Sequence, residues 1–143
     1  MLQVLLPVDT DVDRALAAAN AVTSLPNAAD TVRVTILNVT EKMEVSTEAG
    51  IVQSEDWYDE TNIPEAVERA RSHLEAAGVE TEVRRAHADP AQEILGVADE
   101  IDADQIVMCG RKRSTVGKVL LGSVTQGVLL NAEIPVTVVH APS

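Results

Sequence analysis

The chain alternates between short hydrophobic runs and longer segments in which hydrophobic residues are spaced three or four positions apart. The runs typical of buried strands are Leu2–Pro7, Val32–Val39, Gln105–Cys109 and Pro135–His140. Val79–Ala86 instead alternates small or hydrophobic residues with charged ones, which is typical of an edge strand with one solvated face. Five strands are therefore expected.

Helices are expected between most of these strands, over residues 12–22, 63–78, 89–101 and 123–131. Asp89 and Pro90 suit the cap and the first position of the third helix, and Gly78 suits the end of the second. Residues 40–62 lack periodicity and are interpreted as a long acidic surface loop. Strand and helix alternation of this kind predicts one α/β domain over residues 1–143, with a parallel sheet covered by helices on both faces.

The charge of the chain narrows the range of partners. The net charge is −12, from 23 acidic and 11 basic residues. Such a surface repels nucleic acid and anionic membranes, so neither is expected as a partner. Only three of the basic residues are lysine, and an acidic, lysine-poor surface is typical of salt-adapted proteins, so a halophilic source is expected. The single cysteine, the start without a signal-peptide pattern and the lack of a long apolar run predict a cytoplasmic protein.

Positive charge is concentrated directly after the fourth expected strand. Four of the 11 basic residues stand within eight positions: Arg111, Lys112, Arg113 and Lys118. Gly117 and Gly122 permit unusual backbone conformations, Ser123 suits the cap of the next helix, and Thr125 adds a hydroxyl. Amides at a helix start, hydroxyls and cations are what a polyphosphate needs, and open parallel sheets bind ligands at the carboxyl ends of their strands.

The same segment also fits a role without a ligand, because Gly-Ser is a common helix cap and a basic loop offsets acidic neighbours. The concentration of charge at the end of a strand favours an anion site. Other families fit less well. A P-loop is excluded because six residues separate Gly110 from Gly117 and no Ser or Thr follows Lys118. No close Gly-x-Gly follows the first strand, and a response-regulator receiver would need Asp and Lys where Cys109 and His140 stand.

The remaining candidates for chemistry are isolated residues. His73, His87 and His140 lack metal-ligand spacing and are expected at the surface or at strand ends. Cys109 is expected to be a small core residue. Asp9, after the first strand, fits a helix cap and a ligand contact equally well. No catalytic residue is assigned, because no Ser-His-Asp or Cys-His set is indicated.

Several stretches resemble the universal stress protein family nearly end to end. They are Val4–Asp9, Leu37–Val39, Ala88–Pro90, Asp104–Gly110, Leu121–Thr125 and Pro135–Val139. The resemblance implies a Rossmann-like, adenine nucleotide alpha hydrolase-like domain with three layers (α/β/α) and a five-stranded parallel sheet in the order 3-2-1-4-5. It also implies a homodimer formed through the last strand, Pro135 to Val139, and, in the ATP-binding branch, a nucleotide at the point where the strand order reverses.

The resemblance also assigns roles to residues at this point. Asp9 and Val39 match residues that meet adenine and ribose, whereas Gly110, Gly122, Ser123 and Thr125 match residues that hold the phosphates. Mg²⁺ is expected to accompany ATP. The full nucleotide-binding set, with the two arginines that the charge pattern adds, is Pro7, Val8, Asp9, Val39, Cys109, Gly110, Arg111, Arg113, Gly122, Ser123, Val124 and Thr125.

One position departs from the ATP-binding signature, which is Gly, two residues, Gly, nine residues, then Gly and Ser or Thr. Arg113 replaces the second glycine, and only eight residues separate it from Gly122. An ATP-binding dimeric regulator of the stress response is favoured. A nucleotide-free dimeric module that contacts an unknown protein partner through residues 40–62 is the alternative. A slow ATPase is a third, for which no residue is evidently placed to activate water.

Overall fold

Strands and helices alternate along the chain in the computed structural model, which describes residues 1–39, 64–86, 89–110 and 122–140. The strands are β1 (Leu2–Val8), β2 (Val32–Asn38), β3 (Glu80–Arg85), β4 (Gln105–Gly110) and β5 (Val136–His140). The helices are α1 (Val12–Thr23), α2 (Ala28–Thr31), α4 (Glu65–Ala76), α5 (Pro90–Glu100) and α6 (Gly122–Asn131). The expected strands and helices are all found within a few residues of their predicted bounds. The loop expected over residues 40–62 lies outside the described residues.

The five strands form one sheet in the order β3-β2-β1-β4-β5, and each neighbouring pair is parallel. This confirms the α/β fold and the strand order. β3, which alternates in burial, is one edge of the sheet, and β5 is the other. The chain builds outward from β1 to β3 on one side and then returns to add β4 and β5 on the other, so the strand order reverses between β1 and β4.

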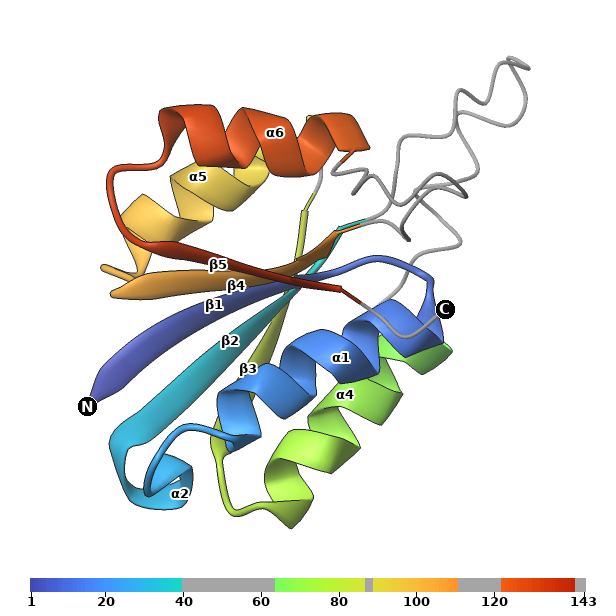
Figure 1. Cartoon of the computed structure of the whole chain (residues 1–143), viewed down its shortest axis with the longest axis vertical. Coiled ribbons are helices and arrows are strands. Elements are labelled where there is room, and N and C mark those ends of the chain that lie inside the picture. Colours follow the sequence, from blue (N-terminus) through green and yellow to red (C-terminus); the bar gives the residue numbers. More distant parts are fainter. Residues whose placement is uncertain (40–63, 87–88, 111–121, 141–143) are drawn as a thin grey trace.

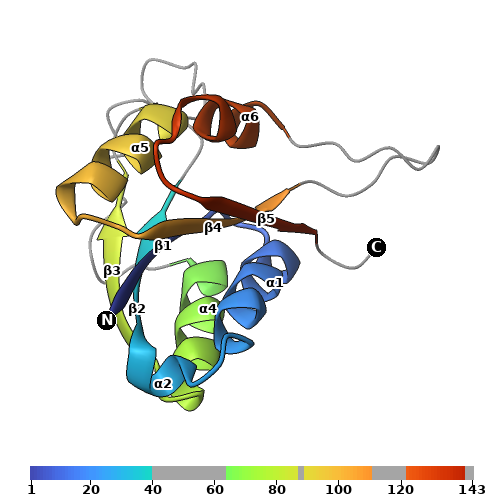
Figure 2. The same ribbon diagram turned by 60° about the vertical axis from the view of Figure 1, so that its left-hand side comes forward.

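Helices cover both faces of the sheet. α1 and α4 lie side by side on one face, and α5 and α6 lie on the opposite face (Figures 1 and 2). This arrangement is the three-layer architecture that strand and helix alternation predicts. Among the described helices, none combines the length and the hydrophobicity that a membrane-spanning helix requires.

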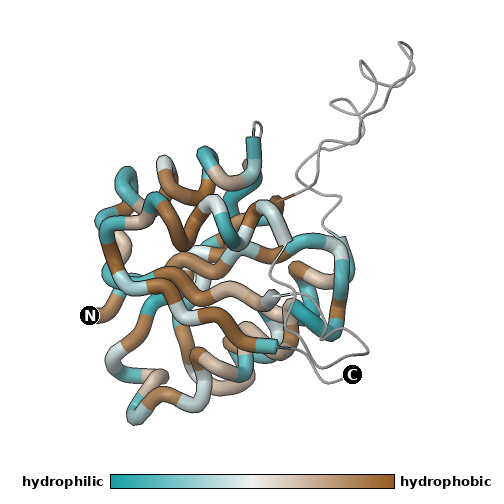
Figure 3. The backbone as a smooth tube through the Cα atoms, turned by 45° about the horizontal axis from the view of Figure 1, so that its top comes forward, coloured by the Kyte–Doolittle hydropathy of each residue, from teal (hydrophilic) through white to brown (hydrophobic). Residues whose placement is uncertain are grey.

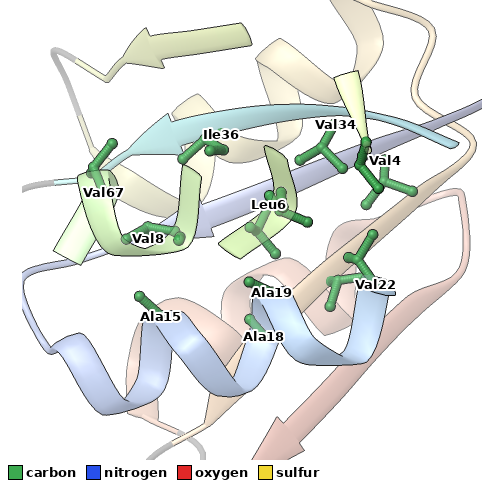
Figure 4. Close-up of a cluster of buried hydrophobic side chains, with 14 of the residues drawn as sticks. Val4, Leu6, Val8, Ala15, Ala18, Ala19, Val22, Val34, Ile36 and Val67 are labelled. Atoms are coloured by element: carbon green, nitrogen blue, oxygen red, sulfur yellow. The ribbon is translucent and has the colours of Figure 1, made fainter. Parts of the chain in front are cut away.

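The sheet separates two hydrophobic clusters. Successive strand residues point to opposite faces, so Leu6 belongs to the first core cluster, under α1 and α4, and Leu5 to the second core cluster, under α5 and α6. In the first core cluster, Ala15 and Ala19 of α1 face the strands, and their small side chains let the helix lie close to the sheet (Figure 4). The hydrophobic positions accordingly follow the central strands and the inward sides of the helices (Figure 3).

Local signals account for several helix ends. Asp89 accepts a hydrogen bond from the backbone N–H of Gln92 at 3.2 Å, and Pro90 is the first residue of α5, as expected. Gly78 ends α4 with a φ of 84°, a conformation that favours glycine. The single-turn helix α2 was not predicted, because its four residues carry no hydrophobic period. It follows Asn27, which has a left-handed φ of 54°.

Candidate functional site

β1 and β4 pair only near their amino-terminal ends. The paired residues are Val4 with Gln105 and Leu5 with Ile106, whereas β1 pairs with β2 along its whole length. The carboxyl ends of β1 and β4 therefore continue without pairing to each other. The helices that follow these two strands, α1 and α6, lie on opposite faces of the sheet (Figure 1). Ligands of open parallel sheets bind at this kind of position.

Pro7 helps to explain why the pairing stops. In β1 the backbone of Gln3 bonds toward β4, since its carbonyl accepts the N–H of Asp104 at 2.7 Å. The carbonyl of Val8 bonds toward β2, since it accepts the N–H of Val39 at 2.8 Å. Because bonding directions alternate along a strand, Pro7 faces β4, and proline has no N–H to donate. The sequence therefore weakens the β1–β4 ladder where the predicted site begins.

Both carboxylate oxygens of Asp9 already have protein partners. Oδ1 accepts the backbone N–H of Asp11 at 2.9 Å, and Oδ2 accepts Nη2 of Arg14 at 2.8 Å. The N-cap of α1 is Asp11 rather than Asp9, because Asp11 accepts the backbone N–H of Arg14 at 3.0 Å. Asp9 therefore holds the turn between β1 and α1 and does not cap the helix, while its contact with a ligand stays a prediction.

Arg14 is a neighbour of the predicted site residue Asp9 that sequence reasoning missed. Its guanidinium lies between two carboxylates, with Nε 3.8 Å from Oδ2 of Asp11 in addition to the short contact with Asp9. The side chain of Arg14 is 24% exposed and that of Asp9 is 44% exposed, so solvent screens this ion pair in part. An arginine three residues after the cap Asp11 was the available signal. Arg14 fixes the Asp9 carboxylate at the edge of the sheet.

At the carboxyl edge of the sheet, Val8 and Val39 can present little besides backbone groups to a ligand. Their side chains are buried on opposite faces of the sheet, Val8 in the first core cluster and Val39 in the second. Cys109 is half-buried and packs against the first core cluster. A ligand at this edge would therefore meet main-chain groups of the strands and the side chains of the turns that follow them.

Gly110, the last residue of β4, is buried and has no side chain to fill its face toward α6. A Cβ atom at this position would lie 3.4 Å from Cγ1 of Val138 and 3.5 Å from Cε1 and Nδ1 of His140. Gly110 follows the alternation of Ile106 and Met108, which belong to the second core cluster. Its bare face is therefore on the side of the sheet that α6 covers.

The amino terminus of α6 lies at the same edge of the sheet (Figure 1). Gly122 has a φ of 79°, which favours glycine. α6 begins at Gly122, so Ser123 lies within the first turn instead of at the predicted cap, because the glycine makes the change of direction into the helix. Ser123 is exposed, Thr125 is 6% exposed, and Val124 packs against the second core cluster. The first turn of α6 contains no acidic residue, so the positive end of its dipole favours an anion there.

The structure thus brings most of the predicted residues to one edge of the sheet. Pro7 to Asp9, Val39, Cys109, Gly110 and residues 122–125 all lie at the carboxyl ends of the strands or at the start of α6. Arg111 and Arg113 lie outside the described residues, so the cationic part of the site stays a prediction. In the described part of the chain, no group of three His, Cys, Asp or Glu side chains is arranged to hold a metal ion.

The fold and this edge define a class of protein, the open parallel α/β domains that bind ligands where the strand order reverses. A sequence model of the universal stress protein family matches residues 1–140. The chain belongs to the universal stress protein family.

Curated relatives match parts of the chain. A universal stress protein of Mycolicibacterium smegmatis is 40% identical over 74 residues, which cover 51% of this chain and 57% of the relative. One of Methanocaldococcus jannaschii is 36% identical over 78 residues, which cover 54% of this chain and 46% of the relative. The chain thus spans about half the length of the curated relatives it matches.

Solved structures match the whole fold. A universal stress protein from Archaeoglobus fulgidus is 26% identical with a TM-score of 0.71, covering 96% of this chain and 98% of that protein. Its family also includes an A. fulgidus protein in complex with dAMP (22% identity, TM-score 0.62, 96% and 97% covered). A family member from Arabidopsis thaliana has AMP bound (15% identity, TM-score 0.66, 100% and 94% covered). At these two lower identities the likeness concerns the fold.

Proposed function

We propose that this chain binds an adenine nucleotide, ATP accompanied by Mg²⁺, at the carboxyl edge of the sheet between β1 and β4. The observation that supports this most directly is that the bare face of Gly110 and the amino terminus of α6 lie on one side of the same edge. The AMP and dAMP complexes of proteins with this fold support an adenine nucleotide as the ligand.

The site divides into two halves in this proposal. Asp9 and Val39 contact adenine and ribose, and Arg14 keeps the Asp9 carboxylate in place. The phosphates lie against Gly110 and the first turn of α6, where free amides and the helix dipole favour negative charge. Arg111 and Arg113 add positive charge to a chain that is otherwise strongly acidic.

The nucleotide acts in regulation of the stress response, in a cytoplasmic homodimer. The dimer forms through β5, whose outer edge has no strand partner among the described residues. The residues Val136 to Val139 are only half-buried in the single chain, and Leu130 of the preceding helix is 82% exposed. An unpaired edge with hydrophobic residues beside it is a surface that a second copy can cover.

Thermal unfolding with and without Mg-ATP tests the proposal. The buffer should contain high salt. Salt screens the mutual repulsion within a chain of net charge −12, and this screening is expected to favour the folded state. A ligand at a hundred times its dissociation constant adds about 2.7 kcal/mol to the free energy of unfolding. Absence of any shift would refute nucleotide binding.

Gly110→Ala is the matched site variant. Its methyl group would make only ordinary contacts at 3.4 and 3.5 Å, so the fold is expected to persist while the face used by the phosphates is blocked. Gly96→Ala is the control, because the Cβ of residue 96 meets nothing within 4 Å and residue 96 lies in α5, away from the site. The ATP-induced shift should be lost in the first variant and kept in the second.

A nucleotide-free interaction module is the second candidate, and one observation favours it. Both oxygens of Asp9 are engaged by Asp11 and Arg14, so the carboxylate is already satisfied without a ligand. Denaturing freshly purified protein and assaying the supernatant for nucleotide separates the two candidates. Released adenine nucleotide supports the first candidate, and its absence together with the lack of a thermal shift supports the second.

A further inference from the structure

His140 ends the edge strand β5 directly beside Gly110. The two residues are partners in the register of β4 and β5. Both Cε1 and Nδ1 of the imidazole lie 3.5 Å from the position that a Cβ of Gly110 would take. The ring therefore borders the face of Gly110 against which the phosphates lie in the proposed function.

The ring is on the same side of the sheet as the amino terminus of α6. Val136 packs against the second core cluster, Val139 packs against the first, and residues of a strand alternate between faces. His140 thus faces the α6 side, as Gly110 does. His140 is exposed, so a ligand at this edge can reach its ring nitrogens.

Few other titratable groups surround this position in the described residues. α6 contains no charged residue, and the only titratable side chain of β4 is Cys109, which packs on the opposite face. α1 also packs against β5, but on the face under the first core cluster, where its charged residues are Asp13 and Arg14. Among the described residues of β4, β5 and α6, His140 is therefore the one side chain able to carry positive charge on the α6 side of the edge.

We propose that His140 is a further phosphate-binding residue, and that its protonated imidazole donates a hydrogen bond to a phosphate oxygen of the bound nucleotide. This inference rests on the proposed function. Hydrogen bonds between two charged groups are the stronger ones, and histidine changes its charge between pH 5 and 8. The affinity for a nucleotide is therefore expected to rise as the pH of the solution falls.

Calorimetric titration with Mg-ATP at pH 5.5 and pH 8 tests this inference on four forms of the chain. Between pH 8 and pH 5.5, the affinity of the native protein for ATP should rise about tenfold more than the affinity of His140→Gln does. His140→Lys should bind tightly at both pH values, because its charge persists. His73→Gln is the control, since His73 lies in the last turn of α4 and contacts Thr23, so it should behave as the native protein does.

Adenosine provides the second measurement, because it has the base and ribose without phosphate. His140→Gln should leave its affinity unchanged. If His140→Gln and the native protein show the same dependence of ATP affinity on pH, His140 does not bind phosphate, although the nucleotide site stands. If the native protein binds no ATP at either pH, the proposed function and this inference both fall. The protonation of ATP itself is common to all forms and cancels in the comparison.

Discussion

Replacing Gly122 by alanine probes the backbone on which the phosphate half of the site depends. The φ of Gly122 is 79°, a conformation that costs a residue with a Cβ roughly 1–2 kcal/mol. Gly122→Ala should therefore lower the free energy of unfolding by about 1 kcal/mol after partial relaxation. For a domain of this size, that corresponds to a fall in Tm of about 4 °C.

The same chemical change should have the opposite sign at Gly96. This glycine lies inside α5, is exposed, and has open space where a methyl group would go. Alanine is favoured over glycine in a helix interior by about 1 kcal/mol, so Gly96→Ala should raise the free energy of unfolding by that amount. The free energy of unfolding should therefore be roughly 1 kcal/mol lower in Gly122→Ala and roughly 1 kcal/mol higher in Gly96→Ala than in the native protein.

Urea unfolding of the three proteins, each with and without Mg-ATP, is the assay. Gly96→Ala should keep the full stabilisation by ATP. Gly122→Ala should lose most of it, because relaxing φ turns the first amides of α6 away from the edge. Equal stability of Gly122→Ala and the native protein would contradict the strained backbone at this position. Full stabilisation of Gly122→Ala by ATP would show that the phosphates lie elsewhere.

Three further predictions concern the scaffold. Leu74 is fully buried in the first core cluster. Leu74→Ala should therefore lower the free energy of unfolding by roughly 3 kcal/mol in a urea titration. A loss below about 1 kcal/mol would contradict tight packing at this position. Hydrogen bonds from Thr81 and Arg71 lower the pKa of Glu75 below its ordinary value of 4.5. Because the pKa is lower in the folded state, the ionised Glu75 carboxylate stabilises the fold at neutral pH, and this contribution is lost as the pH falls below 4.5. The free energy of unfolding of Glu75→Gln should therefore fall less steeply on acidification than that of the native protein. Arg14→Met should cost about 1 kcal/mol at low salt and less at high salt, whereas a salt-independent cost would argue against an ion pair.

The strands and helices were predictable because the buried faces of each element determine how its hydrophobic residues are spaced along the sequence. Gln105–Cys109 is hydrophobic at successive positions, and it forms most of β4, which lies between β1 and β5. Val79–Ala86 alternates, and it corresponds to the edge strand β3. The residues near the carboxyl edge were also predictable, because strand ends follow directly from strand positions and from Gly110 and Gly122.

The contacts within that edge were not predictable in the same way. The pairing of Arg14 with Asp9 depends on side-chain geometry around a turn, and several acidic residues were available to the arginine. The position of His140 depends on the register of two strands that are separated by a helix. A shift of that register by one residue would turn the ring to the other face. Hydrophobic patterns carry no such information.

The central place of β1 in the sheet has a consequence for biosynthesis. β1 leaves the ribosome before the other four strands of the sheet, yet one of its sides is completed only by β4, and Asp104 bonds to Gln3 across 101 positions of the chain. Until then a hydrophobic strand has an open edge, which invites pairing with other nascent chains. A product that terminates after β3 is therefore expected to aggregate, because the open edge of β1 has no strand to cover it.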